Sequence, residues 1–324
     1  MNIEIDSLKL LSKELEGYLQ DYDIGRLVEC SFFKKGLNYT YLVISETEKY
    51  VFRIYRKQWR NIEDILYEID ALKHISRSCK GISLPISNLK GQYICEILHN
   101  FEKHYGVLFS YAEGEIPSID EENSFALGKR LAEIHKASDS FKSIYRRSYN
   151  IDLYHLIDEP IENLNKAIDK YLPKESCELI NSFASYIKKE LRKLELKIGF
   201  CHGDLHDWNV HRYNESYTVF DFDCCGVGYR AYDIAVFLWN LRQNYHEKEE
   251  CCSEAYIEGY LSVKQIDDAD KLSIPLFIIA RKYWLAGVLL KNTDVFGTGW
   301  INEAGFTNFL NQLKKDMEIL KIQI

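Results

Sequence analysis

The spacing of hydrophobic and polar positions changes along the chain, from strand-like in the first third to helical in the rest. In the first third, β-branched and aromatic residues form short runs that turn-like stretches separate, for example at residues 36–38 and 46–49. Runs of this kind are typical of β-strands. They predict five strands, over about 27–33, 39–44, 50–55, 93–97 and 105–110.

Two helices are predicted in the same region, because leucines and isoleucines recur there at intervals of three or four residues. The first covers residues 6–18. The second has the clearest periodicity in the chain, with one apolar stripe made by Ile62, Ile65, Leu66, Ile69, Leu72 and Ile75.

Residues 112–120 (AEGEIPSID) combine Gly, Pro and acidic residues, which is typical of a linker. Beyond them the pattern is almost entirely helical, apart from a predicted hairpin at 210–213 and 217–220. The predicted helices cover about 121–137, 159–171, 175–196, 229–242, 249–261, 269–291 and 306–319. We therefore expect an α+β protein with a β-rich N-terminal lobe (1–111), a linker (112–120) and a helical C-terminal lobe (121–324).

Composition and charge narrow the functional classes. The net charge is −8, and all of it arises after Tyr111. Residues 1–111 hold 15 acidic and 15 basic residues, and the remaining residues hold 34 acidic and 26 basic ones. A protein of this sign repels nucleic-acid phosphates, so we expect no nucleic-acid partner. No apolar run approaches the ~18 residues of a membrane helix, and the first ten residues lack a basic signal-peptide region. The nine cysteines contain no C-x-x-C pair. We therefore expect reduced thiols, a cytoplasmic location and no membrane partner.

The chemistry concentrates between residues 201 and 223. His202, Asp204 and His206 lie within five residues, Asp207 and Asn209 follow, and an apolar strand then leads to Asp221-Phe222-Asp223. One interpretation is a metal-hydrolase cluster, since His-x-Asp-x-His offers three ligands on one side of an extended segment.

The second interpretation is a phosphotransferase site. There an Asp accepts the proton of the attacking hydroxyl, and an Asn five residues later joins a second Asp at a strand end to hold Mg²⁺. Asp204 and Asn209 have this spacing, and Asp221 has this position. A metal hydrolase requires neither Asn209 nor the strand that leads to Asp221.

This second interpretation requires a cation on a strand of the small lobe, paired with an acid on the next helix. Arg53 lies in the middle of a predicted strand, and Glu68 lies on the periodic helix. The stretch around Gly36, between two predicted strands, is where a loop that covers phosphates belongs, although it holds one glycine and not three.

The sequence resembles the aminoglycoside phosphotransferase and choline kinase superfamily over about residues 36–239. That group has a protein-kinase-like, two-lobed fold and includes type II homoserine kinases, methylthioribose kinases and a bacterial stress-response Ser/Thr kinase. The matching stretches are 202–209 (HGDLHDWN), 221–223 (DFD), 228–235 (GYRAYDIA), 131–135 (LAEIH) and 50–53 (YVFR).

The resemblance implies roles for individual residues. Asp204 would be the catalytic base or hydroxyl-orienting group, and Asn209 and Asp221 would bind Mg²⁺. Arg53 would contact the α- and β-phosphates of ATP and pair with Glu68. On the nucleotide side, Gly36 would belong to the phosphate-covering loop, and the 109–112 hinge, with Phe109 and Tyr111, would meet the adenine.

Further residues have candidate supporting roles. The resemblance makes His202 and Asp233 loop-bracing residues, while His206, Asp207 and Asp223 are candidates for substrate contact or loop support. Arg281 could reach an anionic substrate group, and Trp284 could line a substrate pocket. Two departures from related patterns stand out: Arg53 occupies a position where many members have Lys, and Asp223 replaces the Gly of Asp-Phe-Gly.

We therefore expect a kinase that uses ATP and Mg²⁺ to phosphorylate the hydroxyl of a small molecule such as an aminoglycoside, homoserine or a choline-like alcohol. Only a few residues separate Asp223 from Gly228, and no Ala-Pro-Glu follows, so the chain has no room for a phosphorylated activation loop. Two alternatives remain open: a bacterial stress-type Ser/Thr protein kinase, and a nucleotide-binding module without turnover.

Overall fold

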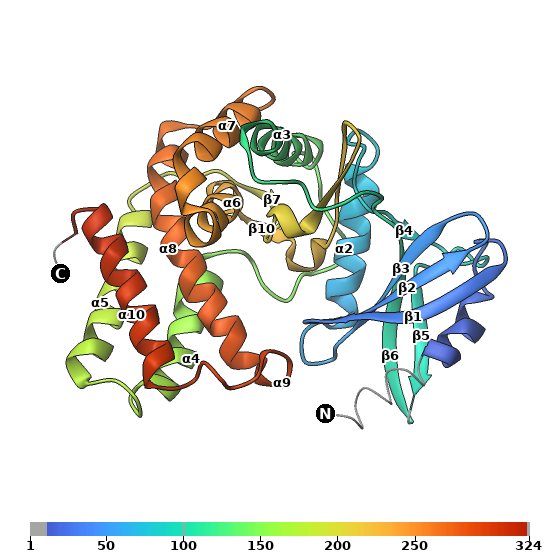
Figure 1. Ribbon diagram of the computed structural model, residues 1–324, viewed down its shortest axis with the longest axis horizontal. Helices are drawn as coiled ribbons and strands as arrows, with labels where there is room; N and C mark the ends of the chain where they lie inside the picture. Colours follow the sequence, from blue (N-terminus) through green and yellow to red (C-terminus); the bar gives the residue numbers. More distant parts are fainter. Residues whose placement is uncertain (1–11, 100, 323–324) are drawn as a thin grey trace. The chain divides into compact units, whose positions relative to one another are not determined.

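The computed structural model describes residues 12–99 and 101–322 (Figure 1). Contacts divide the chain into two compact units. The sheet unit comprises Met1–Glu115, Ser140–Ser148 and Val210–Asp223, and the helical unit comprises Ile116–Asp139, Tyr149–Asn209 and Cys224–Ile324. The helix expected at 6–18 lies partly outside the described residues; residues 12–19 are helical.

An antiparallel sheet forms the centre of the sheet unit, in the order β1-β2-β3-β6-β4, with β5 also paired to β6. The strands are β1 (Leu27–Lys35), β2 (Tyr39–Ser45), β3 (Lys49–Tyr55), β4 (Pro85–Ile86), β5 (Ile94–His99) and β6 (Glu102–Ser110). All five predicted strands are present. The β5–β6 hairpin is tighter than expected, because Glu102 already pairs with His99. The two-residue strand β4 has no pattern in the sequence that predicts it.

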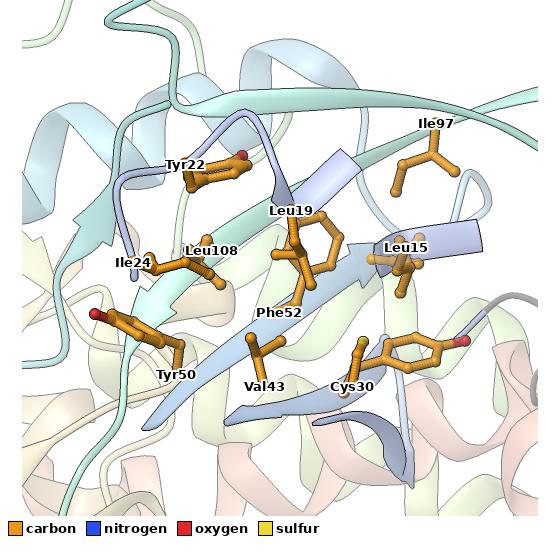
Figure 2. Packing of buried hydrophobic residues seen from close by; sticks show 12 residues of the cluster. Leu15, Leu19, Tyr22, Ile24, Cys30, Val43, Tyr50, Phe52, Ile97 and Leu108 are labelled. Carbon is orange, nitrogen blue, oxygen red and sulfur yellow. The ribbon is translucent and has the colours of Figure 1, made fainter. Parts of the chain in front are cut away.

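The alternation of side chains along β3 separates a core face from a functional face. Tyr50, Phe52 and Ile54 belong to a buried hydrophobic cluster that also includes Leu15 and Leu19 of the helix at 12–19. Figure 2 shows this helix lying over the sheet, with Leu19 beside Phe52 and Leu15 on the side of Cys30. Arg53 and Tyr55 alternate with these residues and therefore point to the other face.

That other face carries helix α2 (Ile62–Ile75), which begins at a capping box made by Asn61 and Asp64. The segment 140–148 is tied to the same helix end, because the backbone N–H and hydroxyl of Ser148 donate to Asp64 at 2.7 and 3.0 Å. The hairpin of β8 (Val210–Tyr213) and β9 (Ser216–Val219) forms as predicted. Its Val219 pairs with Ile82 in the sheet unit.

Helices make up most of the helical unit. They are α3 (Glu121–Ala137), α4 (Glu159–Ile168), α5 (Lys174–Leu191), α6 (Arg230–Asn244), α7 (Glu249–Leu261), α8 (Asp268–Lys291), α9 (Thr293–Phe296) and α10 (Glu303–Ile319). Helices α4 and α5 end earlier than predicted, and a π-helical turn (Tyr154–Asp158) precedes α4. The short antiparallel pair β7 (Ile198–Cys201) and β10 (Gly226–Tyr229) was not predicted.

Helix α8 is long and apolar enough, by length and composition alone, to cross a membrane, but 72% of its most apolar window is buried within the protein. A mostly buried helix of this kind is typical of a protein core. Its two central charges, Arg281 and Lys282, are both buried, and each contacts a carboxylate of the helical unit.

The α+β class predicted from the sequence is confirmed, with a small antiparallel sheet unit and a mostly helical remainder. The units are not contiguous in sequence, however. Segments 140–148 and 210–223 lie within the expected C-terminal lobe but have their contacts in the sheet unit. Hydrogen bonds that cross large sequence separations produce this grouping, and a pattern of local periodicity cannot reveal them.

Candidate active site

The sheet unit brings together Arg53, Glu68 and Asp221. The Arg53 guanidinium donates to Glu68 Oε1 at 2.8 Å, and its other terminal nitrogen lies 3.1 Å from Asp221 Oδ1. The hydroxyl of Tyr55 donates to the second oxygen of Glu68 at 2.8 Å. Glu68 is thus fixed by two donors from alternate positions of β3, and it holds Arg53 in place.

Electrostatics keep Arg53 charged in this buried position. Burial alone would lower its pKa, but the carboxylates of Asp221 and Glu68 outweigh burial and raise the pKa well above the usual value. The guanidinium also lies over the ring of Phe109, with its carbon 4.9 Å from the ring centroid. Arg53 therefore offers a permanent positive charge with a defined orientation.

Asp221 lies at a strained backbone position. Its φ is 62°, which side chains other than Gly adopt rarely, and Asp is among the residues that tolerate it. The side chain is 47% exposed, and Arg53 approaches one of its oxygens. No donor from the described residues lies against the other oxygen, Oδ2. An exposed carboxylate oxygen of this kind is a suitable ligand for a hard cation.

Asp223, two residues later, is a structural anchor. Its carboxylate accepts hydrogen bonds from the indole N–H of Trp59 at 2.5 Å and from Arg60 at 3.0 Å. Its backbone carbonyl accepts from Arg60 and Arg147. Burial raises the pKa of Asp223, but the neighbouring arginines outweigh it and lower the pKa below its usual value. Of the two roles considered for Asp223, this geometry favours loop support.

The expected nucleotide-side residues also lie in the sheet unit. Phe109 is buried near the end of β6. Tyr111 follows the strand, and Lys49 and His211 lie beside the Tyr111 ring. Gly36 lies in the β1–β2 turn, where its N–H donates to the carbonyl of Asn38 at 2.9 Å. An added Cβ at Gly36 would meet only an ordinary contact, so the turn itself does not require glycine.

The helical unit contains the loop 202–209, which we call the candidate catalytic loop. Asp233 on α6 holds its start, because both carboxylate oxygens accept backbone N–H groups, from His202 and Gly203, at 2.7 Å. His135 completes this brace with a 2.9 Å bond to Asp233. Gly203 has φ 82°, and any Cβ there would collide with the carbonyl of Cys224. Only glycine fits this position.

Asp204 lies directly after this brace, with its side chain 24% exposed. Arg281 of α8 contacts its Oδ1, and His206 Nε2 lies 3.8 Å from the same atom. Asn209 ends the loop. Its side-chain N–H donates to the backbone carbonyl of Asp204 at 2.8 Å, while its amide oxygen has no donor among the described residues.

Asp207 is a supporting residue in this geometry. It is buried, and its carboxylate accepts bonds from Asn240 at 2.7 Å and Tyr245 at 2.9 Å. The Nδ1 atom of His206 accepts the backbone N–H of Trp208 at 3.3 Å. Trp208 itself is exposed.

A layer of aromatic residues lies around Arg281. The indole of Trp284, which we considered for a substrate pocket, is buried against the guanidinium and donates to His155 Nε2 at 2.8 Å. The Trp239 ring also lies close, with its centroid 5.2 Å from the guanidinium carbon. No pattern in the sequence indicated a role for His155. Its place in a π-helical turn indicates such a role, because these turns are often found at functional sites.

The described residues do not support the metal-hydrolase interpretation. The one group of three metal-type side chains that comes together in them is His135, Cys201 and Asp233, not His202, Asp204 and His206. In that group, His135 and Asp233 are bonded to each other. Burial raises the pKa of the Cys201 thiol well above its usual value, which disfavours the thiolate that a metal needs.

Comparisons with known proteins agree with this picture. The model of the phosphotransferase enzyme family matches residues 29–271. Homoserine kinase of Agrobacterium fabrum is 24% identical over 300 residues, which cover 87% of this chain and 89% of the relative. A solved amicoumacin kinase in complex with AMP-PNP, Ca²⁺ and Ami has a TM-score of 0.79 at 20% identity, covering 97% of this chain and 96% of that one. A microcompartment-associated aminopropanol kinase has a TM-score of 0.76 at 18% identity, with 94% of each chain covered.

Both solved structures share the fold of this chain, which places the protein in the kinase-like class of α+β folds. Within that class, the chain belongs to the phosphotransferase enzyme family and is a phosphotransferase. The resemblance drawn from residues 36–239 is thereby confirmed.

Proposed function

We propose that the protein transfers the γ-phosphoryl group of ATP to a hydroxyl of a small molecule, with Mg²⁺ as the metal. The observation that carries this proposal is the Arg53 cluster: a buried guanidinium fixed by Glu68 at 2.8 Å and paired with the half-exposed Asp221 at 3.1 Å. A permanent cation beside an available carboxylate is what a metal-bound triphosphate requires.

The donor atoms fit Mg²⁺, which prefers oxygen ligands from one or two carboxylates together with substrate phosphates. We assign Asp221 and Asn209 as its protein ligands, because each keeps an oxygen that no described donor occupies. Mg²⁺ would supply positive charge against the oxygens of the transferring phosphoryl group. Arg53 would bind the α- and β-phosphates, while Glu68 keeps its orientation.

Asp204 would receive the acceptor. The acceptor oxygen forms a bond to the γ-phosphorus as the bond from that phosphorus to the β,γ-bridging oxygen breaks. The hydroxyl proton passes to Asp204, and the electron pair of the broken bond remains with ADP. Most of the rate enhancement then comes from positioning and electrostatics. On the nucleotide side, the 109–112 hinge and the Gly36 turn would contact the adenine and the phosphates.

For the acceptor, we favour a small cationic or zwitterionic alcohol, of the homoserine, choline or aminoglycoside type. The chain after Tyr111 has 34 acidic and 26 basic residues, and this net negative charge attracts a cationic molecule. The names of the similar proteins point the same way, since they include a homoserine kinase, an amicoumacin kinase and an aminopropanol kinase.

The test is Mg²⁺-dependent ATP consumption with a panel of homoserine, choline, ethanolamine, aminopropanol, methylthioribose, several aminoglycosides and a generic protein acceptor. We expect turnover with one small molecule, reduced by about 10²–10⁴-fold in Asp204→Asn and by a comparable factor in Asp221→Ala. Circular dichroism and thermal unfolding of both variants control for folding.

Each other outcome is informative. Near-normal activity in Asp204→Asn contradicts the assigned role of this residue. Turnover with the protein acceptor alone favours a stress-type Ser/Thr protein kinase. ATP binding without consumption for any acceptor favours a nucleotide-binding module.

A further inference from the structure

Arg281 occupies an unusual position for a charged residue. It lies in the middle of the apolar helix α8 and is 3% exposed. One terminal nitrogen, Nη2, contacts Asp204 Oδ1. The other, Nη1, donates to the hydroxyl of Tyr232 at 3.2 Å and to the carbonyl of Gly203 at 3.4 Å. All three partners lie in the helical unit, two of them in the candidate catalytic loop.

Two tryptophan rings lie beside this guanidinium. Its carbon lies 4.2 Å from the ring centroid of Trp284 and 5.2 Å from that of Trp239. Trp284 is held in turn through its bond to His155, whose Nδ1 faces Glu159 at 3.5 Å. Arg281 therefore cannot swing away without breaking an ordered aromatic layer.

The orientation of Arg281 leaves its own Nε–H buried without an acceptor among the described residues. An unpaired buried donor is costly. If the contact with the loop did not constrain the guanidinium, the side chain would turn so that the Nε–H also met an acceptor. The observed geometry instead commits both terminal nitrogens to the candidate catalytic loop and to Tyr232, which indicates that the contact with the loop determines the position of the side chain.

The contacts of Asp204 are one-sided. Arg281 and His206 both approach Oδ1, and no donor from the described part of the chain approaches Oδ2. The two oxygens of the carboxylate are therefore not equivalent. A fixed Oδ1 defines the plane of the carboxylate, and with it the direction of the lone pairs on Oδ2.

We propose that Arg281 is a positioning residue that fixes Oδ1 of Asp204, so that Oδ2 is the atom that accepts the proton of the acceptor hydroxyl. The proposal rests on the proposed function and deepens it. Arg281 contacts neither the acceptor nor the phosphates, so its contribution passes entirely through Asp204. This differs from the contact with an anionic substrate group that its position in the sequence suggests.

A double-mutant cycle on turnover tests this route. Arg281→Met should lower kcat by about 10²-fold, the scale of a displaced reacting group, and leave KM for the acceptor and for ATP unchanged. In an Asp204→Asn background, the same substitution should lower kcat further by less than about threefold, because the group through which it acts is already lost. Arg281→Lys should restore part of kcat, since it keeps the charge but not the planar fork.

Lys282→Met is the matched control, since Lys282 is the next residue of α8 and is also buried, in an ion pair with Asp316 at 2.7 Å. It should lower the thermal unfolding midpoint and leave kcat within about threefold of the original. A similar loss of kcat in Lys282→Met would mean that any damage to α8 suffices. A raised acceptor KM with unchanged kcat in Arg281→Met would mean that Arg281 binds the acceptor, and full additivity with Asp204→Asn would mean that the two residues act separately. Each of these results overturns the proposal.

A second double-mutant cycle measures stability, not turnover. It distinguishes failure of this proposal from failure of the proposed function. The four proteins of the cycle are compared by urea unfolding. The effect of Arg281→Met on the unfolding equilibrium should be smaller in the Asp204→Asn background than in the original protein, because the pair is already broken. Equal effects overturn the Arg281–Asp204 pairing, whether or not the protein consumes ATP. Clear coupling in an enzyme that consumes no ATP with any acceptor leaves the pairing intact but overturns its catalytic purpose together with the proposed function.

Discussion

In each unit, a buried arginine of the candidate site contacts an aspartate, but the surroundings of these two arginines differ. Arg53 in the sheet unit faces two carboxylates, Glu68 and the half-exposed Asp221. Arg281 in the helical unit faces one carboxylate, Asp204, and lies against the rings of Trp239 and Trp284.

This difference indicates two uses of the same side chain. Arg53 contacts two carboxylates, so under the proposed function Asp221 would turn to the metal ion while Glu68 still holds the guanidinium. Arg281 has a single carboxylate partner, two further acceptors in Tyr232 and Gly203, and two tryptophan rings beside it, which suits a fixed contact. Under the proposed function, the sheet unit therefore has an arginine–aspartate contact that a ligand can replace, and the helical unit has a permanent one.

The largest expected effect is on Arg53. Arg53→Met should lower kcat/KM for ATP by about 10²–10³-fold, since it removes the charge offered to the phosphates. Arg53→Lys should retain part of the activity, because the charge remains while the fork that reaches both carboxylates is lost. Steady-state kinetics at varied Mg²⁺-ATP concentration measure both effects.

Lys57→Met provides the control for Arg53, since it removes an exposed cation that follows the same strand and pairs with Glu102 at 3.0 Å. It should leave kcat/KM for ATP almost unchanged. An equal loss in this variant would mean that general charge, and not the Arg53 cluster, governs nucleotide use.

A smaller effect is expected at Arg147, which joins parts of the sheet unit that are distant in sequence. It donates to the carbonyl of Asp64 at 2.7 Å and also contacts the carbonyl of Asp223. Arg147→Ala should lower the free energy of unfolding by about 1.5–3 kcal/mol, the range for hydrogen bonds from charged groups. It should also raise KM for ATP, because Asp221 lies two residues from the released carbonyl. Denaturant unfolding and initial rates measure these effects.

Arg146→Ala is the matched variant, because Arg146 is exposed and its only contact among the described residues runs through its backbone. It should change neither quantity. If Arg147→Ala is as stable and as active as Arg146→Ala, segment 140–148 does not support residues 221–223.

The smallest expected effect concerns Glu159, at the outer end of the layer that supports Arg281. Hydrogen bonds from His155 and Lys291 lower the pKa of this carboxyl from 4.5 to about 2. A depressed pKa stabilises the folded state above pH 4.5, and the stabilisation is lost as the pH falls from about 4.5 toward 2. Glu159→Gln should therefore cost about 1–2 kcal/mol at pH 7, allowing for solvent screening, and progressively less toward pH 3.

Urea unfolding at several pH values measures this dependence, with Glu162→Gln as the control. Glu162 lies on the same helix but is exposed, and it has no ion pair among the described residues. A constant difference between Glu159→Gln and the original protein from pH 7 to pH 3 would contradict the assigned role of the Glu159 carboxylate.

Local patterns in the sequence predicted most of the fold. The predicted bounds of α3 and α7 agree with the structure, and the apolar stripe from Ile62 to Ile75 covers the whole of α2. The pair of β7 and β10 was missed because each strand has only four residues, and its pairing joins positions from 25 (Cys201 and Gly226) to 31 (Ile198 and Tyr229) apart in the chain. Segment 140–148 has no regular structure, so no periodicity could assign it to the sheet unit.

The candidate site shows the same limit. Spacing and residue type predicted Asp204, Asn209 and Asp221 as site residues. The need for a positive side chain on a strand, paired with an acid on the next helix, predicted Arg53 and Glu68. Tyr55, which supports Glu68, and Arg60 and Arg147, which support Asp223, were not predicted. A supporting hydrogen bond depends on tertiary contact and leaves no local pattern in the sequence. The contact of Arg281 with Asp204 could not be predicted for the same reason, because 77 residues separate the two side chains in the chain.

The most direct test of the central claim follows the fate of the γ-phosphoryl group. Phosphorus NMR of Mg²⁺-ATP mixed with the acceptor panel distinguishes a phosphate monoester from inorganic phosphate. We predict a new monoester signal with a small-molecule alcohol, formed as ADP appears and absent when Asp204→Asn replaces the original protein. Conversion of ATP to ADP and inorganic phosphate alone, or a monoester formed equally well by Asp204→Asn, would contradict the account.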